Sequence, residues 1–277
     1  MRGTRGIGAL AACALVLVPG AAGAWGLKAH RWVATRAAGM VGSRCAALVE
    51  GHARELADRA VEPDTVLKSR LGRVEKIRHY LDLDDYGPPP FTALPREQAR
   101  AVARFGRRTV EERGVLPWHA GTLAERLRRE IRDRDWRRAR VTAGHLAHYA
   151  ADATMPLHGT NNHDGQRTGQ RGLHVRVERK LVEGRLPDYV RHARRVGRRR
   201  AIAPGTASDA VFAALERGYE LVAPILAADR AARRGTRTGS ALYYRRLGVD
   251  LEEPLARQLG AAAALTAALW EGACAPP

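Results

Sequence analysis

Apolar residues recur along most of the chain at the three- and four-residue spacing of α-helices, without the sustained alternation that marks strands. Clusters of Gly and Pro punctuate this pattern. The final apolar run, 259–270, is too short to cross a bilayer and is expected in the core. The pattern predicts a single all-α domain with helices over 29–41, 43–59, 65–78, 96–112, 121–133, 136–153, 173–184, 187–200, 207–230 and 249–271.

The first 24 residues have the pattern of an export signal. Basic residues precede an apolar run over 7–18, and small residues at 22–24 provide a site for signal peptidase. Cleavage after position 24 would make Trp25 the first residue of a periplasmic or secreted protein. The alternative is a lipoprotein signal, which would anchor the chain through Cys13.

Two cysteines, Cys45 and Cys274, would remain after cleavage. In an oxidising compartment two distant cysteines can form a disulfide. They can equally be two buried thiols, because a sequence does not give the distance between them. The sequence leaves both possibilities open.

The chain has 277 residues, of which 45% are hydrophobic and 27% charged, a composition that excludes collagen-like and fully disordered proteins. Its 47 Lys and Arg exceed its 29 Asp and Glu, which gives a formal charge of +18. Such a charge attracts nucleic acid, anionic lipid or phosphorylated substrates. The basic runs at 126–140, 191–200 and 233–237 include one aromatic residue, Trp136, whereas surfaces that bind single strands interleave aromatics with basic residues. Solvated helix faces are the simpler interpretation.

Histidines and acidic residues are concentrated in the middle of the chain. His148 and Asp152 are four residues apart, which places both on one face of a helix. A proline ends that helix, and His158 follows closely enough to turn back toward the same pocket. His174 and Glu178 form a second pair with the same spacing. Imidazole and carboxylate groups together suit zinc, so these five residues predict a metal site.

Four upstream residues add to this set. Trp25 and His30 lie at the expected mature N-terminus, and Asp64 precedes His79 by 15 residues. The α-amino group of Trp25, once freed by cleavage, would be a nitrogen donor that becomes neutral at modest pH. With its own carbonyl oxygen it could chelate a metal in a five-membered ring.

Nearby polar residues have less specific roles. His145 shares a helix face with the first pair and could either support the site or pack in the core. His163, in a Gly-rich loop, could touch a substrate or face water. Three acids could orient a metal-binding histidine or cap the turn that follows them; they are Asp82, Asp84 and Asp85.

In order and spacing, these residues resemble those of the zinc-dependent phospholipase C and single-strand nuclease superfamily, exported all-α enzymes with three zinc ions in one cleft. The family pattern is an N-terminal Trp, a His, an Asp and a His, then His-x3-Asp-x5-His and His-x3-Glu or His-x3-Asp. All nine positions are filled here, by Trp25, His30, Asp64, His79, His148, Asp152, His158, His174 and Glu178. The resemblance implies that residues 25–277 form one compact multi-helix hydrolase domain around a three-zinc cleft.

The resemblance also implies how these residues divide among the zinc ions. One ion would be held by Asp64, His79 and His148, and a second by His158, His174 and Glu178. Trp25 and His30 would hold the third, with Asp152 bridging it to the first. Closely spaced zinc ions neutralise the charge of a phosphodiester and make hydroxide available near neutral pH. Asp64 is the candidate catalytic carboxylate, because it could also take a proton from the attacking water.

The implied substrate is a phosphodiester, either in a phospholipid headgroup or in single-stranded nucleic acid. Glu178 favours the phospholipase branch, since the nucleases typically carry Asp there, and residues 159–166 lack the Gly-Gly-Asn usual in those nucleases. The short gap between Trp25 and His30 favours the nuclease branch, as does the basic charge. We expect a bacterial member between the branches that prefers lipid, with peripheral membrane contact and no transmembrane span. A non-enzymatic alternative is a helical protein that binds polyanions through its arginines.

Overall fold

A computed structural model describes residues 25–276. It is 71% helical, and the described residues contain no strand, which confirms the predicted all-α fold. The α-helices are α1 (Gly26–Ala38), α2 (Ala46–Val49), α3 (Ala53–Arg59), α4 (Lys68–Leu71), α5 (Arg73–Lys76), α6 (Gln98–Phe105), α7 (Arg107–Glu112), α8 (Leu116–Arg132), α9 (Trp136–Asp152), α10 (Leu173–Val175), α11 (Leu186–Ala193), α12 (Ala207–Tyr219), α13 (Val222–Arg233) and α14 (Ala241–Ala273).

Shorter helical turns connect these elements. Two are π-helical, namely η2 (Pro63–Leu67) and η5 (Arg176–Val182). The 3-10 turns are η1 (Ser43–Cys45), η3 (Leu83–Tyr86), η4 (Pro156–Gly159), η6 (Glu183–Arg185) and η7 (Pro204–Thr206). The predicted export signal and the alternative lipid attachment at Cys13 lie outside the described residues.

Glycines divide several helices that the apolar pattern predicts as continuous. The predicted ranges 43–59, 65–78, 96–112 and 207–230 are each divided in the structure. Three of these divisions contain a glycine with positive φ, which other residues rarely adopt: Gly51 (74°), Gly72 (55°) and Gly106 (82°). The apolar spacing indicates which side chains face the core. It can continue from one helix to the next across a short turn, so it does not reveal the break.

Helix ends also differ from the predicted ones. Helix α8 begins at Leu116, five residues before the predicted start, with a proline in its first turn. Helix α14 begins at Ala241 and not at 249. Helix α11 ends at Ala193, so the arginine-rich residues 194–200 lie outside it.

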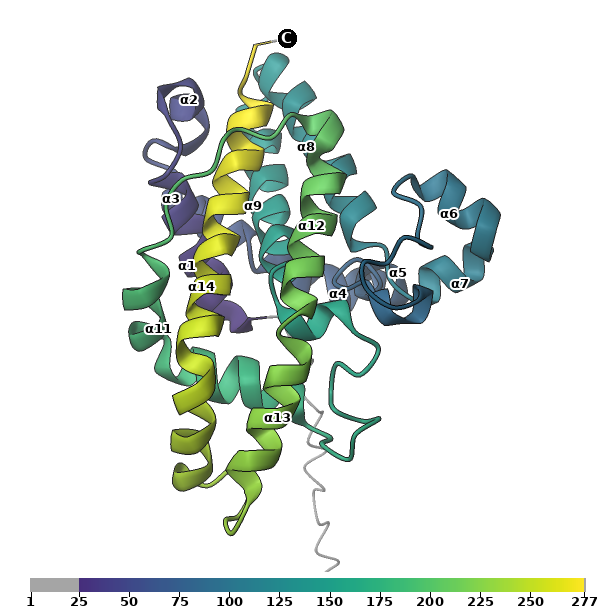
Figure 1. The fold of residues 1–277 in the computed structure, drawn as a ribbon. Coiled ribbons are helices and arrows are strands. Elements are labelled where there is room, and N and C mark those ends of the chain that lie inside the picture. Colours follow the sequence, from purple (N-terminus) through teal and green to yellow (C-terminus); the bar gives the residue numbers. More distant parts are fainter. Residues whose placement is uncertain (1–24, 277) are drawn as a thin grey trace, which may run out of the picture.

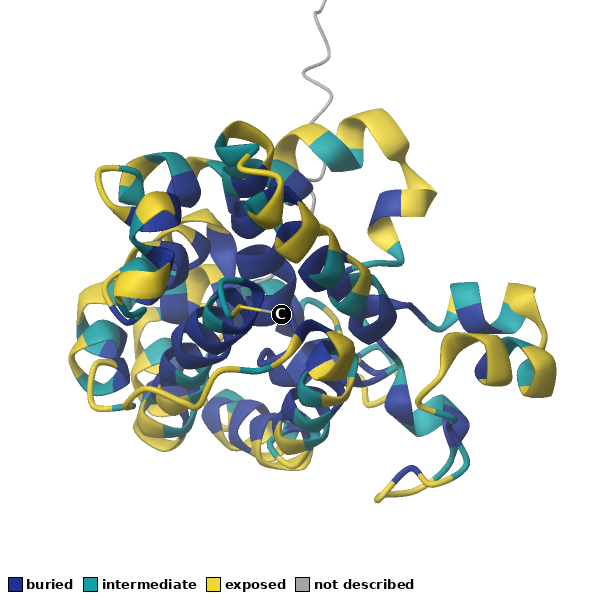
Figure 2. Ribbon diagram, turned by 90° about the horizontal axis from the view of Figure 1, so that it is seen from above, coloured by how far each residue is buried: buried dark blue, intermediate teal, exposed yellow. Residues whose placement is uncertain are grey.

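The long helix α14 forms the centre of the bundle. It packs against α1, α8, α9, α11 and α13, and its C-terminal half is almost entirely buried (Figures 1 and 2). Small residues along this half let its neighbours approach closely. At Gly272 an added Cβ would lie 1.7 Å from the carbonyl oxygen of Ile202. No helix in the described part of the chain is long and apolar enough to cross a membrane.

Helix α9 carries the His148–Asp152 pair and lies deep in the bundle. It packs against α8 and α14, and also against α3. Contact with α3 is close at Gly144, where an added Cβ would lie 2.2 Å from the Cβ of Arg59. Gly144 is one turn before His148, so this close approach brings the end of α3 to the same face of α9 that carries the pair.

A disulfide joins the two ends of the described chain. Cys45, at the end of η1, is bonded to Cys274, directly after α14, with their Cα atoms 5.6 Å apart. Of the two possibilities that the sequence left open, the bridge is the one observed.

Helices α6 and α7 form a lobe that projects from the side of the bundle (Figures 1 and 2).

Candidate metal centre

Helix α9 presents two buried polar side chains to one point. His148 and Asp152 are both fully buried, and Nε2 of the histidine lies 3.3 Å from Oδ2 of the aspartate. Nδ1 of His148 donates a hydrogen bond to the carbonyl oxygen of Ala60, at 2.8 Å. Because a carbonyl can only accept, this bond places the proton on Nδ1 and leaves Nε2 as an unprotonated ligand atom in the neutral ring.

The first cluster consists of Asp64, His79 and His148. Oδ1 of Asp64 lies 3.6 Å from Nδ1 of His79 and 3.8 Å from Nε2 of His148, and these two nitrogens are 3.1 Å apart. Ligand atoms about 2.0–2.2 Å from a tetrahedral zinc ion are about 3.3–3.6 Å from one another. The three observed separations are within a few tenths of an ångström of these values, so small side-chain shifts would bring the cluster to the dimensions of a zinc site.

The second cluster consists of His158, His174 and Glu178. The loop turn η4 carries His158, while α10 and the π-helix η5 carry the other two. Oε1 of Glu178 lies 2.5 Å from Nε2 of His174 and 3.4 Å from Nε2 of His158, and the two nitrogens are 3.3 Å apart. Three ligand atoms again converge on one point.

The third cluster brings the first helix into the site. Nε2 of His30, on α1, lies 3.4 Å from Oδ1 of Asp152, and the His30 ring stacks on that of His148 at a centroid separation of 4.0 Å. His30 and Asp152 are both fully buried. Together with His148, they form a third group of side chains whose ligand atoms are close enough to hold one metal ion.

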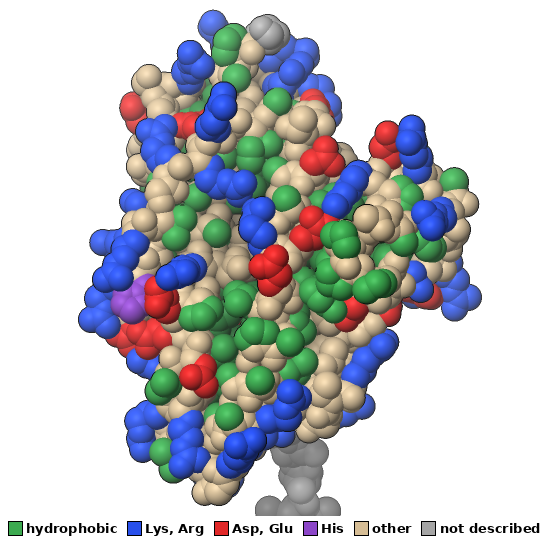
Figure 3. All heavy atoms as spheres, viewed as in Figure 1, with side chains coloured by type: hydrophobic (Ala, Val, Ile, Leu, Met, Phe, Trp, Pro, Cys, Tyr) green, Lys and Arg blue, Asp and Glu red, His purple; other side chains and the backbone are tan. Residues whose placement is uncertain are grey.

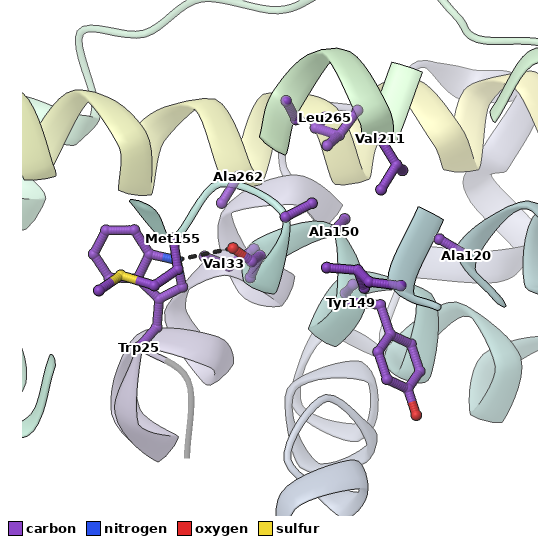
Figure 4. Packing of buried hydrophobic residues seen from close by; sticks show 14 of the residues in the cluster. Trp25, Val33, Ala120, Tyr149, Ala150, Met155, Val211, Ala262 and Leu265 are labelled. Atoms are coloured by element: carbon purple, nitrogen blue, oxygen red, sulfur yellow. Dashed lines mark hydrogen bonds between the residues drawn. The ribbon is translucent and has the colours of Figure 1, made fainter. Parts of the chain in front are cut away.

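Trp25 holds the beginning of α1 in place. Its indole is fully buried beside Met155, and Nε1 donates a hydrogen bond of 2.9 Å to the carbonyl oxygen of Ala151 (Figure 4). Its backbone has φ 48°, in the left-handed region that non-glycine residues rarely occupy. Packing of the indole thus fixes the residue that was predicted to supply a ligand through its backbone. That role as a ligand stays a prediction.

Asp152 connects the clusters. Its Oδ1 faces His30, whereas its Oδ2 lies 2.9 Å from Nδ1 of His79 and 3.9 Å from Nδ1 of His158. Burial by itself would raise the pKa of Asp152, but the charges of His148 and His158 and the hydrogen bonds from the histidines outweigh it and hold the pKa well below its usual value. Asp152 is therefore a carboxylate at neutral pH, available to two cations at once.

The donor set fits metal ions. Oδ2 of Asp64 and Oε2 of Glu178 are buried without a hydrogen-bond partner among the described residues. A buried carboxylate oxygen without a partner is costly, and a cation supplies the missing interaction. Imidazole nitrogen with carboxylate oxygen is typical of zinc sites, although several divalent metals accept the same ligands. The three clusters can thus hold metal ions, and the geometry leaves the identity of the metal open.

A buried carboxylate behind the first cluster was missed in the sequence. Glu75 is fully buried, and its Oε1 lies 3.3 Å from Nε2 of His79 and accepts a hydrogen bond from the hydroxyl of Tyr149. Its Oε2 accepts a bond of 2.9 Å from Nη1 of Arg78. Such a carboxylate orients the ring of a metal-binding histidine. The signal was available, since Glu75 and His79 are four residues apart.

The acids predicted as possible partners of that histidine lie elsewhere. Asp84 accepts hydrogen bonds from Oγ1 of Thr160, at 2.6 Å, and from the backbone N–H of Asn161, at 2.9 Å. Asp85 accepts from the Asn161 side chain. These two acids therefore hold the loop that follows His158, and within the described residues neither forms a hydrogen bond or ion pair with His79.

Two further histidines have different surroundings. Nε2 of His145 lies 2.9 Å from Oε2 of Glu62, outside the three clusters, so the residue does not face the site. The ring of His163 meets that of His174 edge to face, with centroids 5.9 Å apart. Of the two, His163 is the one placed beside a cluster.

No family model matches the chain, and no curated protein matches it. The case for a metal centre therefore depends on the convergence of eight side chains from six separate segments of this chain into three adjoining groups.

Proposed function

We propose that this protein is an exported, zinc-dependent phosphodiester hydrolase, closer to phospholipases C than to single-strand nucleases. The observation that carries the proposal is the position of Asp152 between clusters: its Oδ1 faces His30 of the third cluster, and its Oδ2 faces His79 and His148 of the first. A carboxylate shared in this way places cations close together, and closely spaced cations suit a phosphodiester, whose two non-bridging oxygens share one negative charge. A single structural zinc site would need no sharing.

When bound, the ions would neutralise the phosphate and make hydroxide available near neutral pH. The side chains provide the framework for this chemistry. Asp152 supplies fixed negative charge between the sites, and Ala60 and Glu75 hold His148 and His79 in orientation. The charges of His148 and Lys68 outweigh the burial of Asp64 and lower its pKa. It is therefore ionised at neutral pH and able to receive a proton from the attacking water.

We favour a lipid over a nucleic-acid substrate. Single strands are bound by stacking their bases on exposed aromatic rings. The exposed large apolar side chains of the described residues are all Leu or Val. The positive charges on the face in Figure 3 are also interleaved with acids and do not form one stripe. Single-stranded nucleic acid remains the second candidate, because the formal charge of +18 favours it.

Export is supported by two features. The first 24 residues have the composition of a signal, and the Cys45–Cys274 disulfide is compatible with an oxidising compartment. If cleavage follows position 24, the amino group and carbonyl of Trp25 complete the third site beside His30. Edman sequencing of the secreted protein should begin at Trp25, and a lipid-blocked terminus would exclude this ligand.

Activity should be measured side by side on bis-p-nitrophenyl phosphate, phosphatidylcholine and single-stranded DNA. We expect hydrolysis that disappears with a chelator and returns with zinc, with lipid preferred over DNA. Glu178→Gln should reduce turnover on all substrates, while His145→Ala, on the helix that carries His148, should leave it unchanged. The proposal fails if metal-loaded protein hydrolyses none of the three. Binding of polyanions without turnover, weakened steeply by salt, would instead support the non-enzymatic alternative.

A further inference from the structure

A solvent-exposed segment lies between two residues of the first cluster. Residues 65–78 connect Asp64 to His79 through most of η2, α4 and α5. Helix α4 contains no buried residue, and Glu75 is the only buried residue in α5. We call residues 65–78 the α4–α5 segment. The exposure of this segment contrasts with the buried side chains of Asp64 and His79, which flank it in the chain.

This segment exposes apolar side chains. Val66 and Leu71 are each 43% exposed and Val74 is 54% exposed. They make up half of the exposed large apolar residues in the described part of the chain; the others are Leu27, Leu242 and Val249. Contiguous apolar exposure is typical of an interaction surface, and these three side chains lie within nine residues of the chain.

The charge of the same segment is one-sided. Arg70, Arg73 and Lys76 are exposed. The acid within the segment, Glu75, is fully buried behind His79. Among the described residues, one ion pair involves these three side chains, the contact of 3.7 Å between Arg73 and Glu112 of α7, and the remaining outward charge is available to an anionic partner.

The α4–α5 segment also borders the metal centre. Lys68, in α4, forms an ion pair with Asp64. Lys68 therefore lies beside the first cluster, and the segment begins and ends next to two residues of that cluster, Asp64 and His79. A partner bound to this segment would therefore lie next to the first cluster.

We propose that the α4–α5 segment docks the protein on an anionic phospholipid bilayer, with Val66, Leu71 and Val74 inserted at the boundary between headgroups and acyl chains. Arg70, Arg73 and Lys76 then contact the headgroup phosphates. Aliphatic side chains surrounded by Lys and Arg are typical of surfaces that lie in the membrane interface. A polynucleotide would require stacking rings, and the exposed apolar residues of this segment are aliphatic. The inference rests on the proposed lipid specificity and names the surface that delivers the substrate.

Docking can be measured without catalysis, by sedimentation with phosphatidylcholine vesicles with and without phosphatidylserine. The triple variant Val66→Ser, Leu71→Ser and Val74→Ser should bind roughly 100-fold more weakly, because each half-inserted aliphatic side chain adds up to about tenfold. The variant Arg70→Gln, Arg73→Gln and Lys76→Gln should lose the preference for phosphatidylserine. The matched control is Leu242→Ser with Val249→Ser on α14, where Val249 is 82% exposed, and it should bind as the wild type does.

Hydrolysis separates this proposal from the proposed function. The apolar triple variant should lose activity on vesicles while it retains activity on soluble bis-p-nitrophenyl phosphate. The docking proposal is overturned if the apolar triple variant binds vesicles as tightly as the wild type does. It is also overturned if that variant loses binding to single-stranded DNA and keeps its binding to vesicles. An absence of activity on every substrate, with vesicle binding intact, overturns the proposed function and leaves docking standing. If the triple variant does not fold, Val74→Ser alone should weaken vesicle binding by up to about tenfold.

Discussion

His79 and Asp152, which are 73 positions apart in sequence, meet in the interior with Nδ1 of the histidine 2.9 Å from Oδ2 of the aspartate. On its other side, Nε2 of His79 lies 3.3 Å from the carboxylate of Glu75. A neutral imidazole has one N–H, so it can donate to one of these carboxylates only. If the N–H is on Nε2 and donates to Glu75, Nδ1 faces the carboxylate of Asp152 with a lone pair. A cation between Nδ1 and that carboxylate would stabilise this arrangement.

The sharing of Asp152 predicts unequal losses of metal. Glu178→Ala should remove one zinc ion per chain, since Glu178 belongs to the second cluster alone. Asp152→Ala should remove two, because its two oxygens face the first and third groups. Mass spectrometry of purified, zinc-equilibrated protein measures both. His145→Ala is the control, and equal zinc content in the two test variants would contradict the shared site.

Glu75 should tune metal affinity without being a ligand. Glu75→Ala frees the ring of His79 to rotate and should weaken binding at the first site by about 10–100-fold, the usual effect of removing a carboxylate behind a metal-binding histidine. Zinc titration against a competing chelator gives the affinity. Glu75→Gln keeps an acceptor oxygen and should lose less. A variant with unaltered affinity would show that Glu75 serves packing alone.

The stability of the metal-free protein should depend on pH through Glu75. Burial raises its pKa, but bonds from His79, Tyr149 and Arg78 outweigh burial and lower it to about 2 from 4.5. A group with a lowered pKa in the folded state contributes stability above its unfolded pKa, and this contribution is lost as pH falls from about 4.5 to about 2. The difference in free energy of unfolding between the wild type and Glu75→Gln should therefore narrow over that range. Urea titrations with a chelator at pH 7 and pH 3 measure this difference. A difference in the free energy of unfolding that grows as the pH falls would contradict the prediction.

The disulfide should contribute substantially to stability. Cys45→Ser with Cys274→Ser should lower the free energy of unfolding by about 2–5 kcal/mol, because the bridge restricts the unfolded chain over a separation of 229 residues. Urea denaturation measures the loss. A reductant should weaken the wild type by the same amount and leave the double variant unaffected.

The local parts of the site could be predicted because they follow from the helical period. Four-residue spacing places His148 above Asp152, and His174 above Glu178, on one face, as the structure has them. Glu75 and His79 have the same spacing, yet this pair was missed. The spacing alone does not distinguish a buried pair from the many exposed ones, and burial is what gives Glu75 its role.

The sequence by itself determined the all-α class and the two pairs at four-residue spacing, because periodicity and residue type are properties of neighbouring positions. The resemblance to a known family added the remaining residues, of which the structure brings all but Trp25 into the three clusters. Tertiary structure decided which helices meet: the close approach at Gly144 that brings Ala60 to His148, the bridge between Cys45 and Cys274, and the exposure of the α4–α5 segment. These depend on contacts between segments far apart in the chain. The free energy of these contacts comes from close packing between two particular segments, and it cannot be predicted from residue spacing along one helix.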